Sequence, residues 1–249
     1  MQTLVTGSNG HLPQSQSGFT AAFPAQHLRI LALGDSLIYG YGDPDGGGWV
    51  DRLRRSWMAP DSHGHVLYNL GVRGDRVQQV ARRLEHEFRH RGELRHRVPD
   101  GIIFSVGVND SARLGRPDGR NFTDFQEFQA DLANLLDRAQ QLCQVFFVGM
   151  APVDEQKMPF SGCLYYNHAD QQRYKEATRF ACLERRIPYL DIFDRWLAEG
   201  DSIWQSRLTA DGLHPNSAGY TALLQEVLAW EPLQQWFNTP LTTSEAIAS

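Results

Sequence analysis

Short runs of aliphatic residues alternate along this chain with longer segments whose apolar residues recur every three to four positions. The runs lie at residues 28–33, 65–70, 101–106, 145–150 and 188–192. Continuous apolar runs of this length are typical of parallel strands buried on both faces, and the longer period is typical of amphipathic helices. The alternation predicts an α/β fold, a three-layer α/β/α sandwich around a flavodoxin-like five-stranded parallel sheet.

Three apolar stripes predict helices that would cover this sheet. They begin at Val77, at Phe125 and near Tyr220, and a less regular pattern over about 167–186 predicts a further helix. Thr123 followed three residues later by Gln126 is typical of a capping box, so we expect Thr123 to cap the second helix. We expect a serine, Ser217, to cap the helix that contains Tyr220.

Length and composition favour one folded domain. The chain has 249 residues, 41% of them hydrophobic, which is enough for one large core. Residues 1–26 contain no Asp, Glu, Lys or Arg, and their polar composition predicts a flexible leader. We therefore expect the domain to span residues 27–233 and to be followed by a tail over residues 234–249.

Charge and composition exclude several functional classes. A net charge of −5 gives no general attraction to nucleic acid, so we expect a small-molecule substrate and no nucleic-acid partner. The sequence has no apolar run long enough for a membrane span and no secretory signal, which predicts a cytoplasmic protein. The glycines of segment 34–42 match no nucleotide-binding pattern, and His63 and His65 lack a third metal ligand, so we expect neither cofactor nor metal. The oligomeric state is left open.

Polar motifs follow the ends of the predicted strands. They are Gly34-Asp35-Ser36-Leu37, a glycine-rich turn with Gly71 and Gly74, Gly107-Val108-Asn109-Asp110, and Asp211-Gly212-Leu213-His214. Because the carboxyl ends of parallel strands meet at one edge of a sheet, we expect these motifs to lie together. Taken singly, each motif has a simpler explanation as a helix cap or a turn.

Together the motifs suit acyl transfer. A serine hydroxyl is a weak nucleophile that needs a neighbouring base, and the base needs an acceptor to orient it. Asp211 and His214 are three residues apart, so the carboxylate can hold one imidazole nitrogen while the other faces Ser36. Backbone N–H groups of Ser36 and of the glycine-rich turn, with the side-chain amide of Asn109, could donate to an oxyanion.

The four motifs, in this order from Gly34 to His214, resemble the SGNH hydrolases, also called GDSL-type esterases and lipases. The resemblance implies a serine esterase or lipase that cleaves an ester or thioester through an acyl-enzyme intermediate, without a cofactor. It implies Ser36 as nucleophile, Asp211 and His214 as its catalytic partners, and Ser36, Gly74 and Asn109 as oxyanion donors. The sequence leaves Gly71 as an alternative to Gly74. An acyltransferase and a catalytically silent binding module are the alternative functions.

A long loop at residues 151–166 follows the fourth predicted strand. Long loops at the active edge of such a sheet are often functional, and this one contains several aromatic residues. We expect Phe160, Tyr165 and Tyr166 to contact substrate, with a loop packed on its own aromatics as the alternative.

Overall fold

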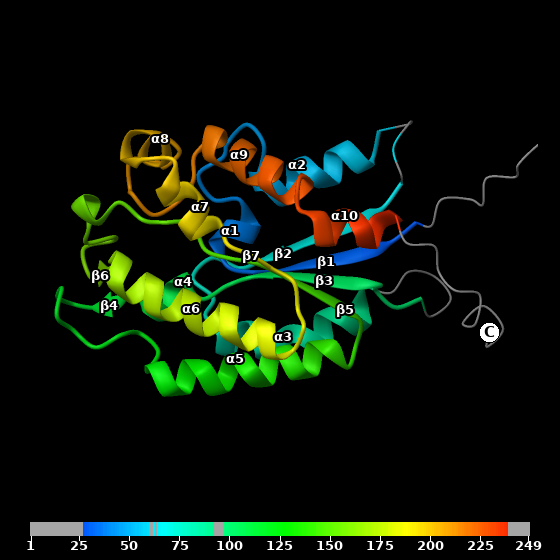
Figure 1. Cartoon of the computed structure of the whole chain (residues 1–249), viewed down its shortest axis with the longest axis horizontal. Coiled ribbons are helices and arrows are strands. Elements are labelled where there is room, and N and C mark those ends of the chain that lie inside the picture. Colours follow the sequence, from blue (N-terminus) through cyan, green and yellow to red (C-terminus); the bar gives the residue numbers. More distant parts are fainter. Residues whose placement is uncertain (1–26, 60–61, 63, 92–96, 239–249) are drawn as a thin grey trace, which may run out of the picture.

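The computed structural model describes residues 27–238, except 60–61, 63 and 92–96 (Figure 1). The leader predicted over residues 1–26, and residues 239–249, lie outside the described residues. Helix α10 (Glu231–Asn238) continues across the domain boundary predicted at 233, and its Trp236 and Phe237 pack against the core. The predicted boundary therefore falls too early, because these two aromatic residues belong to the folded domain.

The predicted five-stranded parallel sheet is confirmed, with strand order β2-β1-β3-β5-β7. Helices cover both of its faces, so four residues of β1, 30–33, are fully buried. The last strand is shorter than predicted because the following residue, Asp191, already caps a helix. The strands are β1 (Arg29–Gly34), β2 (Val66–Gly71), β3 (Gly101–Ser105), β5 (Gln144–Val148) and β7 (Tyr189–Leu190).

Two layers of helices enclose the sheet (Figure 1). The predicted helices are confirmed, whereas α2 was not predicted although its Trp49, Val50, Leu53 and Trp57 are buried in the core. One layer consists of α3 (Val77–His90), α5 (Phe125–Gln140) and α6 (His168–Glu184). The other consists of α2 (Gly48–Trp57), α9 (Ser217–Leu228) and α10.

Two helix caps differ from the sequence prediction. Asp124, not Thr123, caps α5, because its carboxylate accepts two backbone N–H groups of the first turn. The Thr123 hydroxyl is instead buried and donates to Asp110 at 2.7 Å. Asn216, not Ser217, caps α9 in the same way.

Short elements build the loops around the sheet. Strands β4 and β6 pair antiparallel, which joins the loop after β3 to the loop after β5. These elements are α1 (Ser36–Tyr39), α4 (Val108–Ser111), β4 (Arg113–Leu114), the 3₁₀ helix η1 (Glu155–Lys157), β6 (Leu164–Tyr165), α7 (Ile192–Ala198) and α8 (Asp201–Ser206).

Among the helices of the described ranges, none is both long enough and apolar enough to cross a bilayer.

Candidate active site

The segment after β1 presents Ser36 at the carboxyl edge of the sheet. The Asp35 side chain accepts a hydrogen bond from the Leu37 N–H at 2.9 Å and so caps the short helix α1. Ser36 is the first residue of that helix. Because Asp35 performs the capping, the Ser36 hydroxyl is left for a different contact.

That contact is with His214, although 178 positions separate the two residues in the chain. The Ser36 Oγ lies 3.0 Å from His214 Nε2, and Asp211 Oδ2 lies 2.7 Å from His214 Nδ1. An ionised Asp211 only accepts, so it holds the imidazole proton on Nδ1 and leaves Nε2 free to accept. Ser36 is 4% exposed and His214 is 3% exposed, so this hydrogen-bonded pair is almost fully buried.

The Asp211 carboxylate is held by its own loop. Its Oδ1 accepts hydrogen bonds from the Thr209 hydroxyl at 2.6 Å and from the backbone N–H groups of Leu213 and His214 at 2.8 and 3.0 Å. Burial works to raise the pKa of Asp211, but the hydrogen bonds from His214, Thr209 and the backbone hold it below the ordinary value. Asp211 therefore stays ionised and can stabilise a protonated imidazole.

Aromatic rings support the hydroxyl and the imidazole. The Tyr220 hydroxyl, on α9, donates to the backbone oxygens of Ser36 and Tyr41 at 3.2 and 3.0 Å. The Tyr41 and Phe160 rings meet the His214 ring edge-on, with centroids 4.6 and 5.5 Å away. Tyr41 was not predicted to belong to the site, although its position in the glycine-flanked segment directly after α1 was an available signal.

The side-chain amide of Asn109, on α4, lies between the segments that carry Ser36 and Gly74. Its Nδ2 donates to the backbone oxygen of Asp75 at 2.9 Å and faces a carboxylate oxygen of Asp35 at 3.5 Å. Asp35 precedes Ser36 and Asp75 follows Gly74 in the chain. These contacts bring three of the predicted site residues to one point at the sheet edge.

The two glycines after β2 have different surroundings. The Gly71 N–H donates to Asn69 Oδ1 at 3.1 Å, and a Cβ on Gly71 would lie 2.1 Å from the Tyr39 nitrogen. Gly74 has φ +82°, and a Cβ there would meet nothing within 4 Å. Within the described residues no hydrogen-bond partner is found for the Gly74 N–H. Gly71 is thus used for close packing, whereas Gly74 has an unengaged donor beside open space.

The comparison with known proteins assigns the chain to a family. The model of the GDSL-like lipase/acylhydrolase family matches residues 32–222, which include most of the sheet and all the residues of the site. The chain belongs to this family. A relative of this GDSL-family hydrolase is the uncharacterized protein YpmR of Bacillus subtilis, 24% identical over 218 residues, 81% of this chain and 80% of that protein.

Solved structures share the fold of this GDSL-family hydrolase. A lipase/acylhydrolase from Enterococcus faecalis superposes with a TM-score of 0.62 at 19% identity, covering 86% of this chain and 99% of that one. The esterase EstA from Pseudoalteromonas sp. gives 0.60 at 20% identity, covering 85% and 99%. A variant of the acetyl xylan esterase Axe2 from Geobacillus stearothermophilus gives 0.63 at 17% identity, covering 87% and 97%.

The three aromatic residues predicted to bind substrate have different positions in this GDSL-family hydrolase. Phe160 contacts the His214 ring. Tyr165 lies in β6, where it pairs with Arg113. Tyr166 is 2% exposed, and its hydroxyl contacts Asn109 rather than open space.

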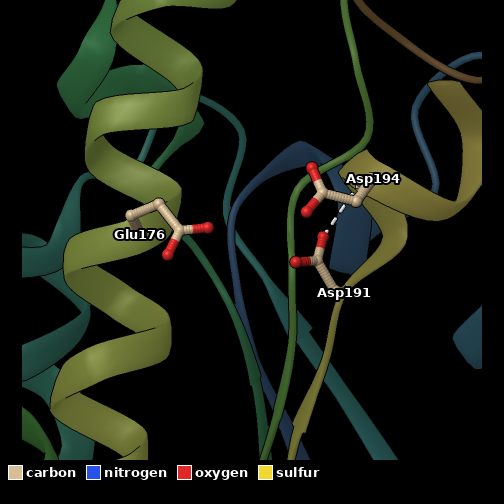
Figure 2. A group of neighbouring side chains, drawn as sticks. All are labelled: Glu176, Asp191 and Asp194. Atoms are coloured by element: carbon tan, nitrogen blue, oxygen red, sulfur yellow. Dashed lines mark hydrogen bonds between the residues drawn. The ribbon is translucent and has the colours of Figure 1, made fainter.

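A separate group of carboxylates lies between α6 and α7 in this GDSL-family hydrolase. Figure 2 shows Glu176 on α6 facing Asp191 and Asp194 at the start of α7. The fully buried Lys175 ammonium lies within 2.6 to 3.0 Å of an oxygen of each. Lys175 thus supplies the positive charge between these carboxylates, and the group is an ion-pair network that joins α6 to α7.

Two further carboxyl groups, Asp35 and Asp110, are buried beside the site. Burial, with the neighbouring charges of Asp110 and Asp75, raises the pKa of Asp35 to about 7, against the Leu37 N–H that lowers it. Burial likewise raises the pKa of Asp110 to about 6, although hydrogen bonds from Thr123 and a backbone N–H oppose the shift. Both groups favour the protonated form more strongly in the folded protein than in the unfolded chain.

The raised pKa values of Asp35 and Asp110 predict that the folded protein loses stability as the pH rises. A carboxyl group whose folded pKa lies above its unfolded value stabilises the fold fully below about pH 4, and the stabilisation is lost as pH rises through the folded pKa. Asp35→Asn removes one such group while keeping a good helix cap. We measure the free energy of unfolding in urea at pH 5 and at pH 8. Its decrease between these pH values should be smaller for the variant than for wild type, by on the order of 2 kcal/mol.

The control for this measurement is Asp124→Asn, the same replacement at the exposed cap of α5. It should leave the wild-type drop in stability unchanged. An equal drop in wild type and in Asp35→Asn would contradict the prediction.

Proposed function

We propose that this family member is a serine esterase that hydrolyses a small carboxylic ester through an acyl-enzyme on Ser36. The observation that carries the proposal is the continuous hydrogen-bonded line from Ser36 Oγ through His214 to Asp211. A hydroxyl, a free imidazole nitrogen and an ionised carboxylate in this order are what nucleophilic acyl transfer requires. The family assignment independently supports hydrolysis.

Each of the three residues has a role in the proposed hydrolysis. Ser36 Oγ attacks the ester carbonyl carbon while His214 Nε2 takes the hydroxyl proton, and Asp211 stabilises the imidazolium that forms. When the tetrahedral intermediate collapses, His214 gives this proton to the leaving alcohol, and Ser36 keeps the acyl group. Water, deprotonated by His214, then attacks the acyl-enzyme carbonyl carbon. As this intermediate collapses, His214 returns the proton to Ser36 Oγ and the carboxylic acid leaves.

The proposed oxyanion donors are the N–H groups of Ser36 and Gly74 and the Nδ2 of Asn109. Gly74 is favoured over Gly71 because the Gly71 N–H already donates to Asn69. Donors fixed before the reaction stabilise the developing charge without reorganisation, which is the main electrostatic contribution in such sites.

The neighbours with the same fold also support an esterase. Variants of Axe2 that lack a serine, a histidine or an aspartate are each described as catalytic mutants of that acetyl xylan esterase. Ser36, His214 and Asp211 are the same three residue types. Because Ser36 and His214 are almost fully buried, and Tyr41 and Phe160 flank the imidazole, we propose a short acyl group such as acetyl.

A fluorophosphonate probe tests the proposal. Ser36 Oγ would displace fluoride from phosphorus, and peptide mass spectrometry should locate the adduct on Ser36. An EstA structure is described as inhibited by monoethylphosphonate, so a neighbour with this fold accepts a phosphonate. The labelled enzyme should also stop hydrolysing p-nitrophenyl acetate. A protein that neither labels nor hydrolyses a panel of p-nitrophenyl esters would be a binding module instead, and transfer to an added alcohol in preference to water would indicate an acyltransferase.

The proposed role of His214 predicts a pH dependence. The imidazole must be neutral to accept the Ser36 proton, so protonation removes the general base. We expect kcat/KM to fall as the pH is lowered from about 8 to about 5. Initial rates with p-nitrophenyl acetate at low substrate concentration measure this profile. A flat profile across that range would contradict the assignment of the base.

A further inference from the structure

The side-chain amide of Asn109 is held at both of its ends. Its Nδ2 lies 2.9 Å from the backbone oxygen of Asp75, and its Oδ1 lies 3.2 Å from the Tyr166 hydroxyl. A backbone carbonyl can only accept, so the nitrogen of the amide must face Asp75. The amide oxygen therefore faces Tyr166, and the Tyr166 hydroxyl must be the donor.

The position of Tyr166 is fixed by the small antiparallel sheet. Tyr166 directly follows β6, and β4, which pairs with β6, begins two residues after the helix α4 that carries Asn109. Arg113 of β4 also donates to Asp170 of α6 at 3.0 Å, just beyond Tyr166 in the chain. The loop that carries Asn109 and the loop that carries Tyr166 are thus fastened together.

The surroundings of Tyr166 suit a permanent donor. Its side chain is 2% exposed, so water does not compete for the Asn109 oxygen. Burial, together with the negative charges of Asp35 and Asp110, raises the pKa of Tyr166, which keeps the hydroxyl protonated. A buried Asn109 oxygen without this donor would bear an uncompensated desolvation cost.

We propose that Tyr166 is a positioning residue, which directs the second N–H of Asn109 toward the oxyanion by donating a hydrogen bond to Asn109 Oδ1. The proposal rests on the proposed function and replaces the expectation that Tyr166 binds substrate. Asp75 takes one N–H of the amide, so the plane set by Asp75 and Tyr166 fixes the direction of the other. That second N–H has only a long contact, 3.5 Å to Asp35 Oδ2, which the oxyanion would replace. Donation to the amide oxygen also polarises the amide and strengthens its N–H as a donor.

Tyr166→Phe removes the hydroxyl and keeps the buried ring. We expect kcat for p-nitrophenyl acetate to fall about three- to tenfold, the size of one hydrogen bond, while KM changes less than twofold. In an Asn109→Ala background the same replacement should have no further effect on kcat or on the rate of fluorophosphonate labelling, because its target is gone. A residue that merely filled the core would lower the rate by the same factor in both backgrounds.

The matched control is Tyr174→Phe, since Tyr174 is also fully buried and its hydroxyl donates to the backbone oxygen of Thr123 at 2.6 Å. It should lower the urea unfolding midpoint and leave kcat unchanged. Two results would overturn the inference: an equal loss of kcat for Tyr166→Phe with and without Asn109, or a rise in KM with kcat intact. If wild type still labels at Ser36, the proposed function would stand. A wild type that neither labels nor hydrolyses would overturn the proposed function, and this inference with it.

Discussion

Replacing Ser36 by alanine should lower kcat for ester hydrolysis by about a millionfold, the scale seen when a serine hydrolase loses its nucleophile. No other hydroxyl is found within hydrogen-bond distance of His214 Nε2 among the described residues, so nothing nearby can take over the attack. Fluorophosphonate labelling should disappear as well. The measurements are hydrolysis of p-nitrophenyl acetate and mass spectrometry of the probe-treated protein.

The fold should survive this change. Alanine keeps the backbone of α1, whose cap is Asp35, and the lost hydroxyl contributes one hydrogen bond, to His214. We expect the free energy of unfolding in urea to change by no more than about 1 kcal/mol. Ser56→Ala, which removes a hydroxyl that donates to the Leu53 oxygen on α2, is the control and should keep wild-type turnover. If folded Ser36→Ala retained more than a small fraction of the activity, another residue would have to be the nucleophile.

Asn109→Ala should lower kcat about a hundredfold to a thousandfold and leave KM nearly unchanged. The amide has no part in activating Ser36. Its second N–H, which has only the long contact of 3.5 Å with Asp35, is proposed to act as charge develops on the substrate oxygen. The loss corresponds to about 2.7–4 kcal/mol of transition-state stabilisation, the value of one oxyanion donor. Steady-state kinetics with p-nitrophenyl acetate separate kcat from KM, and labelling by the fluorophosphonate should continue at a lower rate.

Asn121→Ala provides the comparison for Asn109→Ala. The Asn121 amide donates to the Ser111 oxygen at 2.8 Å, at the end of the same helix α4, but does not contact the residues around Ser36. A comparable loss of kcat in this variant would mean that distortion of α4, not a missing donor, explains the effect. A rise in KM with unchanged kcat in Asn109→Ala would make Asn109 a ground-state binding residue and remove it from the proposed oxyanion hole.

The sheet was predictable because its inner strands β1, β3 and β5 are buried on both faces. Such strands are continuous apolar runs, and each predicted run coincides with an observed strand to within a few residues. The position of the site was predictable for the same reason, since Ser36 and Asn109 follow strand ends directly. The β4–β6 pair was not predictable, because two-residue strands carry no period of their own.

The sequence indicated which polar side chains are buried better than it indicated which groups they contact. Tyr220 was placed on the core face of its helix by periodicity, but nothing in the period indicates that its hydroxyl reaches the backbone of Ser36 and Tyr41. Tyr166 was recognised as part of a loop at the active edge, yet its contact with Asn109 depends on how two loops meet in space. Thr123 fitted a local capping pattern, and the tertiary contact with Asp110 prevailed over it.

The position of α10 has a practical consequence for immobilising the protein on a solid support. The Trp236 ring covers Gly101, the first residue of β3, so α10 lies at the end of the sheet opposite Ser36 (Figure 1). A cysteine introduced at Asn238, after the exposed Cys163 is replaced, would give a thiol anchor at that end. A bead or electrode attached there would hold every molecule with the edge that carries Ser36 turned toward the bulk solution, where substrate arrives by diffusion.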